Sequence, residues 1–108
     1  MSVADRYVSA VNAADEAALM ALFATGAVLR HPLGTFSGHA EMSAFYRDVV
    51  FAGGARTEIT RRVDGPGVEI AQIEAVGPDG DRGRRAHAVD VFVLGGDGLV
   101  TELEIYYR

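Results

Sequence analysis

The sequence predicts a single α+β domain in which helices pack on one face of a curved antiparallel sheet. In the first half of the chain, apolar residues recur at the three- and four-residue spacing of amphipathic helices. The second half contains four β-branched segments separated by turns rich in Gly, Pro and Asp. Helices followed by hairpin-linked strands are typical of an α+β fold.

Length and composition narrow the class of protein further. The chain has 108 residues, enough for one core, so we expect one domain over residues 1–108. The net charge is −5 and no large basic cluster is present, which argues against nucleic acid and membrane surfaces as partners. The chain has no cysteine, no signal-peptide pattern and no apolar run of membrane-spanning length, so we expect a cytoplasmic protein.

Three helices are expected in the first half. The first spans residues 3 to about 12, and the second starts after Asp15, a suitable N-cap, and stops near Gly26. The third runs from about His39 to Phe51. Their apolar stripes are Val3, Tyr7, Ala10 and Val11, then Ala18, Leu19, Leu22 and Phe23, and finally Met42, Phe45, Tyr46 and Val49.

The remaining segments are predicted to be strands and turns. A strand over residues 27–31 ends at Pro32, which cannot donate to a ladder, and the turn over residues 33–38 holds a short piece of strand. The second half contributes four strands, at Arg56–Val63, Val68–Val76, Arg84–Leu94 and Leu99–Tyr107. Their hairpin turns are Asp64–Gly67, Gly77–Asp81 and Gly95–Gly98.

The strand around Asp90 carries the first candidate functional residue. Alternation places one set of its residues on a common face, namely Ala86, Ala88, Asp90, Phe92 and Leu94. A buried ionised carboxylate is costly, so Asp90 either faces water, pairs with Arg30 or Arg84, or stays protonated in an apolar pocket. The opposite face of this strand is also apolar, which predicts that a second copy covers it in a homodimer.

Two further residues could take part in chemistry. Tyr7 shares a helix face with Val3 and Val11, so its ring belongs to the core, but its hydroxyl still needs a partner. His31 shares a strand face with Leu29, and its imidazole titrates near neutrality, as a general base should, although a structural histidine would look the same. The histidines show no close ligand spacing, so we expect neither a metal nor a cofactor.

Several segments together resemble the ketosteroid isomerases. The matching residues are Arg6–Val8, Ala10, Asn12, Ala13, Asp15, Ala21–Ala24, Pro32–Gly34, Phe45, Tyr46, Asp90, Phe92, Gly96, Gly98 and Val100. These steroid delta-isomerases belong to the wider NTF2-like and SnoaL-like superfamily, which includes nuclear transport factor 2 and the polyketide cyclases. The resemblance implies a cone-shaped fold, with three N-terminal helices packed on a curved antiparallel or mixed sheet.

The resemblance also implies roles for four residues. Tyr7 and a protonated Asp90 would form an oxyanion hole, and Tyr46 would support Tyr7 through a hydrogen bond. His31 stands at the position of the general base, where the isomerases have an aspartate.

The implied activity is cofactor-free proton transfer next to the carbonyl of a small apolar substrate, a steroid or polycyclic ketone. The residues expected to line its site are Leu29, Met42, Phe45, Phe92, Leu103 and Tyr107. Two alternatives remain on the same scaffold. One is a polyketide cyclase or dehydratase, and the other is a hydrophobic-ligand-binding protein without turnover.

Overall fold

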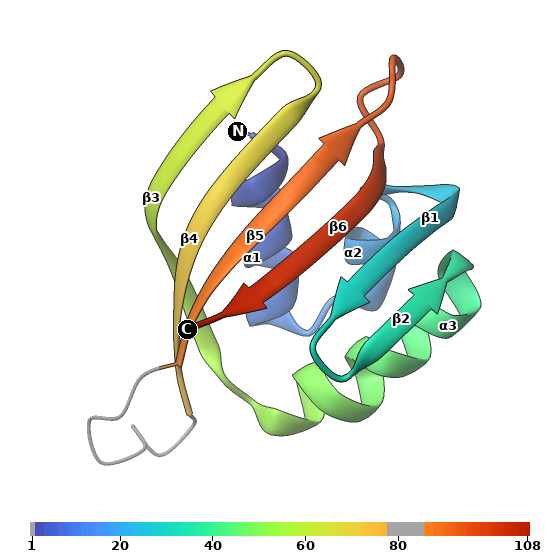
Figure 1. Ribbon diagram of the computed structural model, residues 1–108. Helices are drawn as coiled ribbons and strands as arrows, with labels where there is room; N and C mark the ends of the chain where they lie inside the picture. The colour runs from blue at the N-terminus through green and yellow to red at the C-terminus, as the bar shows by residue number, and fades with distance from the viewer. Residues whose placement is uncertain (1, 78–85) are drawn as a thin grey trace.

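The computed structural model describes residues 2–77 and 86–108, which form one six-stranded sheet in the order β2-β1-β6-β5-β4-β3 (Figure 1). The strands are β1 Phe23–His31, β2 Gly34–Ser37, β3 Arg56–Gly65, β4 Val68–Val76, β5 Ala86–Leu94 and β6 Val100–Tyr107. Neighbouring strands are antiparallel except β1 and β6, which run parallel. The sheet is therefore mixed, and the predicted α+β class is confirmed.

The helical segments are α1 Val3–Ala13, α2 Glu16–Met20, α3 Gly38–Phe45 and the π-helix η1 Tyr46–Phe51. In Figure 1, α1 and α2 lie behind the curved sheet, and α3 runs alongside β2 and extends past the lower edge of the sheet. Helix α1 contacts β3 and β4, while α3 contacts β1 and β2. The core fills the space between these helices and the sheet, and its largest fully buried side chains are Tyr46, Phe92, Leu19, Leu29, Met42, Leu103 and Val100.

A buried carboxylate fixes the start of α1 against the sheet. Glu69 of β4 accepts hydrogen bonds from the backbone N–H groups of Val3 and Ala4, at 3.2 and 3.1 Å. These N–H groups have no partner inside the helix, and a negative charge there is favourable. A capping box between Ser2 and Asp5 satisfies further groups. The first turn of α1 is thereby anchored one turn before Tyr7.

The second helix is shorter than predicted, because it ends at Met20 and β1 begins at Phe23. The backbone N–H of Val100 donates to Leu22 O at 2.9 Å, and Phe23 pairs with Val100 across the sheet. Leu22 and Phe23 are buried, and burial of these apolar side chains would be expected whether they belonged to a helix or to a strand. Periodicity alone therefore could not locate this boundary.

The third helix has nearly the predicted extent, but its last part is π-helical from Tyr46 to Phe51. A π-helix has wider turns than an α-helix, and such segments often occur at functional sites. Tyr46, its first residue, is fully buried. The predicted apolar stripe is only partly correct, since Met42, Phe45 and Tyr46 are buried while Val49 is 43% exposed.

The predicted faces of the β5 strand are confirmed. Asp90 and Phe92 are buried on the helix side, and Val93 is 38% exposed on the other side. Residues 84–85, which begin the predicted strand, and most of the predicted Gly77–Asp81 turn lie outside the described residues. Over the ranges described here, no helix has the length and apolar character needed to cross a membrane.

Candidate active site

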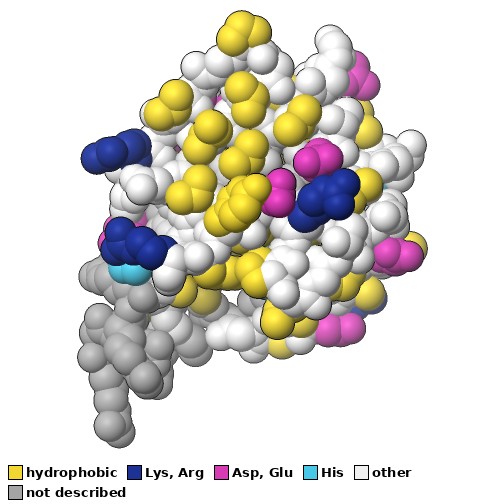
Figure 2. All heavy atoms as spheres, viewed as in Figure 1, with side chains coloured by type: hydrophobic (Ala, Val, Ile, Leu, Met, Phe, Trp, Pro, Cys, Tyr) yellow, Lys and Arg dark blue, Asp and Glu magenta, His cyan; other side chains and the backbone are white. Residues whose placement is uncertain are grey.

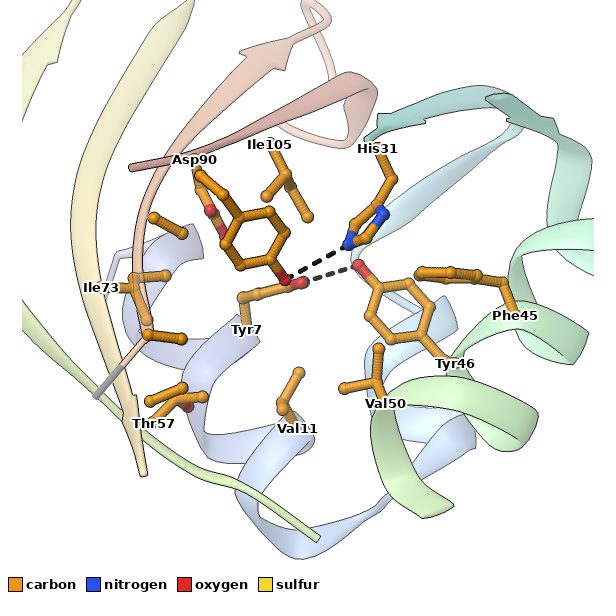
Figure 3. Close-up of a pocket in the computed structure, with 14 residues that line it drawn as sticks. Tyr7, Val11, His31, Phe45, Tyr46, Val50, Thr57, Ile73, Asp90 and Ile105 are labelled. Atoms are coloured by element: carbon orange, nitrogen blue, oxygen red, sulfur yellow. Dashed lines mark hydrogen bonds between the residues drawn. The ribbon is translucent and has the colours of Figure 1, made fainter. Parts of the chain in front are cut away.

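A cavity of about 80 Å³ lies between the sheet and the helices (Figure 3). Most of its lining is apolar. The ionisable side chains that the structure places in this lining are Tyr7, His31, Tyr46, Asp90 and Tyr107. The four residues predicted to be catalytic therefore meet in one cavity, although they come from α1, β1, η1 and β5.

The two tyrosine hydroxyls form a buried pair. The oxygens of Tyr7 and Tyr46 lie 2.7 Å apart, as expected for a supporting hydrogen bond. Burial raises the pKa of both phenols, so both hydroxyls keep their hydrogens near neutral pH. Since one hydroxyl donates to the other, the second hydrogen is free to bind an oxygen in the cavity.

Asp90 is 3% exposed, and its Oδ1 has no hydrogen-bond partner among the described residues. Arg30 cannot neutralise it, because Arg30 is on the opposite face of the sheet and pairs with Glu102 at 3.6 Å. Arg84, the other predicted partner, lies outside the described residues. Burial raises the pKa of the Asp90 carboxyl to about 7, so it exchanges a proton near neutral pH.

His31, at the end of β1, has hydrogen bonds at both ring nitrogens. The backbone N–H of Leu33 donates to Nδ1 at 3.0 Å, and Nε2 lies 3.3 Å from the Tyr107 hydroxyl. The ring also packs against Phe45, with centroids 4.8 Å apart, and burial lowers the pKa of the imidazole. A general base needs a free nitrogen lone pair, and the neutral ring already uses its lone pair to bind Leu33.

The predicted substrate-contacting residues divide into two groups. Phe45 and Tyr107 line the cavity. The other four are in the core, fully buried and not part of this lining: Leu29, Met42, Phe92 and Leu103. The sequence could not separate the two groups, because an inward-facing apolar position is equally compatible with core and with cavity.

The cavity also has lining residues that the sequence did not single out. These are Val11, Val50, Thr57, Ile73, Ala75, Ala86, Ala88 and Ile105. Strand alternation could have identified Ala86 and Ala88, which share the face of Asp90. Ile105 pairs with Asp90 across β5 and β6, and finding it required the strand register. Residues 2–77 and 86–108 contain no cluster of three potential metal ligands.

The fold and the site define a small, cone-shaped α+β domain of the NTF2-like class with an apolar cavity beneath its helices. Comparison of the sequence with protein families assigns it more closely. The chain belongs to the SnoaL-like domain family, whose profile matches residues 4–103. None of the curated proteins matches the sequence.

Solved structures share this fold at low identity. A Kribbella flavida protein provisionally described as a ketosteroid isomerase is 18% identical with a TM-score of 0.84, covering 98% of this chain and 75% of its own. A Sinorhizobium meliloti protein provisionally described as a polyketide cyclase is 19% identical with a TM-score of 0.85. The match covers 96% of this chain and 93% of the Sinorhizobium protein. A Sphaerobacter thermophilus protein is 25% identical with a TM-score of 0.82, covering 98% and 93%.

Proposed function

We propose that the protein is a cofactor-free enzyme of the isomerase type, which moves a proton at a carbon next to the carbonyl of a small apolar ketone. The observation that carries this proposal is the buried, unpartnered carboxyl oxygen of Asp90 in the same apolar cavity as the Tyr7–Tyr46 pair. Neutral hydroxyl donors in a low-dielectric site stabilise an enolate oxygen, and a carboxyl group with a pKa near 7 can exchange protons.

The cavity favours a ketone smaller than a steroid. Its volume is about 80 Å³, whereas sites for drug-sized ligands usually measure about 300–1,000 Å³. The side chain of Tyr107 lines the cavity and is 53% exposed, so it lies on the solvent side. A steroid or polycyclic ketone would require this side chain to move.

One alternative function is supported by the hydrogen bonds of His31. Because the Nδ1 lone pair binds Leu33 N–H, the site lacks the free imidazole base that the sequence predicts. A protein that binds apolar ligands without turnover would need no such base. A measurement of turnover decides between this binding function and the proposed enzyme activity.

We expect the protein to convert a β,γ-unsaturated cyclohexenone into its conjugated isomer, followed by ultraviolet absorbance. Exchange of ketone hydrogens in deuterium oxide, followed by proton NMR, is the second measurement. Tyr7→Phe should lower kcat about 100-fold, because it removes a hydroxyl donor to the enolate. Tyr106→Phe is the matched control, since Tyr106 does not line the cavity. If the wild-type protein catalyses neither reaction, the enzyme proposal is wrong.

The outer face of the sheet carries an apolar patch, visible among the spheres in Figure 2. The patch consists of Val63, Val68, Ile70, Val89, Val91, Val93 and Tyr106. Val63 and Tyr106 are 59% and 52% exposed, and a contiguous exposed patch of apolar side chains is typical of an interaction surface. The half-exposed Arg30–Glu102 pair at its edge offers both charges to a two-fold-related copy. We propose that a second copy of the chain covers this face.

Val91→Glu is expected to convert the dimer into a monomer, because it adds a carboxylate to the apolar patch between Ile70 and the carboxylate of Glu104, its two cross-strand neighbours. Light scattering during size-exclusion chromatography measures the mass. Val49→Glu is the matched control, since Val49 is exposed on η1 and lies outside the patch. A monomeric wild-type protein would refute this interface.

A further inference from the structure

We infer that Asp90 is the group that accepts the substrate proton, and that His31 is a hydrogen-bond donor that positions the Tyr107 hydroxyl against the substrate oxygen. This assignment rests on the proposed function. It changes the roles that the sequence predicts for His31 and Asp90, and it adds Tyr107 as a polar residue of the site.

The turn after β1 determines which nitrogen of His31 carries the hydrogen. Pro32 has no N–H, so Leu33 supplies the first N–H after the strand, and it points at Nδ1 from 3.0 Å. A hydrogen on Nδ1 would place two hydrogens between two nitrogens at this distance. The neutral ring therefore carries its hydrogen on Nε2. Protonation of the ring would break the bond to Leu33, which opposes a role for His31 as base.

The hydrogen on Nε2 gives Tyr107 a defined orientation. It is donated to the Tyr107 hydroxyl oxygen over 3.3 Å, which leaves the hydroxyl's own hydrogen available to a ligand. The His31 ring is itself packed between Phe45 and Tyr107, at centroid distances of 4.8 and 5.3 Å. Tyr107 is thus a preorganised donor at the solvent side of the cavity, and His31 acts through it.

Asp90 is the remaining candidate for the proton acceptor. The other ionisable groups of the described lining are His31 and three tyrosines, whose hydroxyls are donors at neutral pH because their pKa values are raised. The Thr57 hydroxyl already donates to Asn12 over 2.9 Å. Among the residues that the structure describes, Asp90 alone offers a buried side-chain oxygen without a hydrogen-bond partner. Its pKa of about 7 also makes the carboxylate a stronger base than an ordinary aspartate.

The reaction balances without an additional reactant. The bond between the α-carbon and its hydrogen breaks, and the proton goes to the Asp90 carboxylate, which lines the cavity. The electron pair of that bond forms a carbon–carbon double bond, while the carbonyl π pair moves to oxygen and gives an enolate. The Tyr107 hydroxyl donates a hydrogen bond to the enolate oxygen, and the free hydrogen of the Tyr7–Tyr46 pair is a second donor in the same cavity. Asp90 then returns the proton to the γ-carbon, where the π pair of the β,γ double bond forms the new carbon–hydrogen bond. The enolate oxygen pair re-forms the carbonyl, and the π pair at the α-carbon moves to the α,β bond, which gives the conjugated ketone and restores the Asp90 carboxylate.

Nitrogen-15 NMR of histidine-labelled protein tests the His31 tautomer independently of activity. Comparison with His31→Gln identifies the His31 signals among those of His39 and His87. We expect the shift of an unprotonated nitrogen for Nδ1 and of a protonated nitrogen for Nε2. Tyr107→Phe should move the Nε2 signal and leave the signals of His39 and His87 in place. A hydrogen on Nδ1 of the neutral ring would overturn the inference.

Kinetics with the β,γ-unsaturated cyclohexenone distinguish the role of Asp90 from the role of His31. Asp90→Asn should lower kcat/KM at least about 100-fold and abolish the rise of kcat/KM with pH. His31→Gln keeps an N–H donor but cannot accept a proton at neutral pH, so its loss should stay within about 10-fold. His31→Gln added to Tyr107→Phe should cause little further loss, because His31 acts through the Tyr107 hydroxyl.

The outcomes distinguish this inference from the proposed function. If the wild-type protein shows neither isomerisation nor hydrogen exchange, both the function and the inference are wrong. If the wild-type protein is active and Asp90→Asn keeps that activity while His31→Gln loses it, only the inference is wrong. Unfolding curves of each variant verify that it is folded.

Discussion

The wild-type protein is expected to lose roughly 3 kcal/mol of unfolding free energy between about pH 5 and about pH 9, and Asp90→Asn should lose far less. Folding raises the pKa of Asp90 from 3.8 to about 7, because the carboxyl is buried without a partner. The folded protein therefore holds this proton more tightly than the unfolded chain. The stabilisation is complete below the unfolded pKa and is lost as the pH rises through 7. Urea denaturation across this pH range measures it.

Two other ionisable groups with shifted pKa values, His31 and Asp5, also make the unfolding free energy depend on pH. One acts in the opposite direction to Asp90, and the other acts over a more acidic pH range. The pKa of His31 is lowered by burial, so its contribution grows with pH and opposes that of Asp90. Hydrogen bonds with Arg62 and Ser2 lower the pKa of Asp5, so its contribution disappears only at more acidic pH. Asp48→Asn, at an exposed carboxyl group, is the matched control and should keep the wild-type slope. An unchanged slope in Asp90→Asn would refute the raised pKa.

Phe92→Ala should lower the unfolding free energy by about 4 kcal/mol, because it removes a fully buried ring and leaves a void. The ring of Phe92 packs edge-on against Tyr7, with centroids 5.2 Å apart, so the void adjoins the site. Guanidinium denaturation measures the loss. Val93→Ala, at the next and partly exposed position, should cost about 1 kcal/mol or less.

This comparison also decides between core and cavity for Phe92. The sequence predicts that Phe92 contacts the substrate, whereas the structure places it in the core. A loss below about 1 kcal/mol would mean that the ring contributes little to the packed core. It would then favour the original prediction.

Much of the fold follows from local pattern. The alternation around Asp90 predicts correctly which face of β5 is buried, because side chains of a strand alternate strictly. The boundary at Phe23 could not be predicted, because hydrogen bonding to Val100, distant in sequence, ends the helical segment there. The π-helix from Tyr46 to Phe51 likewise has no signal in the spacing of apolar residues.

The site was predictable to a different degree. The resemblance groups Tyr7, Tyr46, Asp90 and His31, and the structure places these four side chains in the lining of one cavity. The resemblance carried no information on the hydrogen bonds of His31, because one partner is the backbone N–H of Leu33 and the other is Tyr107 on a distant strand. Backbone donors and strand pairing are invisible in a list of side chains.

The parallel pairing of β1 and β6 has a consequence for folding. It joins His31 to Tyr107 across 76 positions of sequence, whereas every other neighbouring pair of strands is antiparallel. Contacts between distant parts of a chain form slowly, because a large loop must close first. Hairpins β3–β4 and β5–β6 can therefore assemble before this pair forms. The hydrogen bond between His31 and Tyr107 would then report the completion of folding, since both strands must be in register before the ring reaches the Tyr107 hydroxyl.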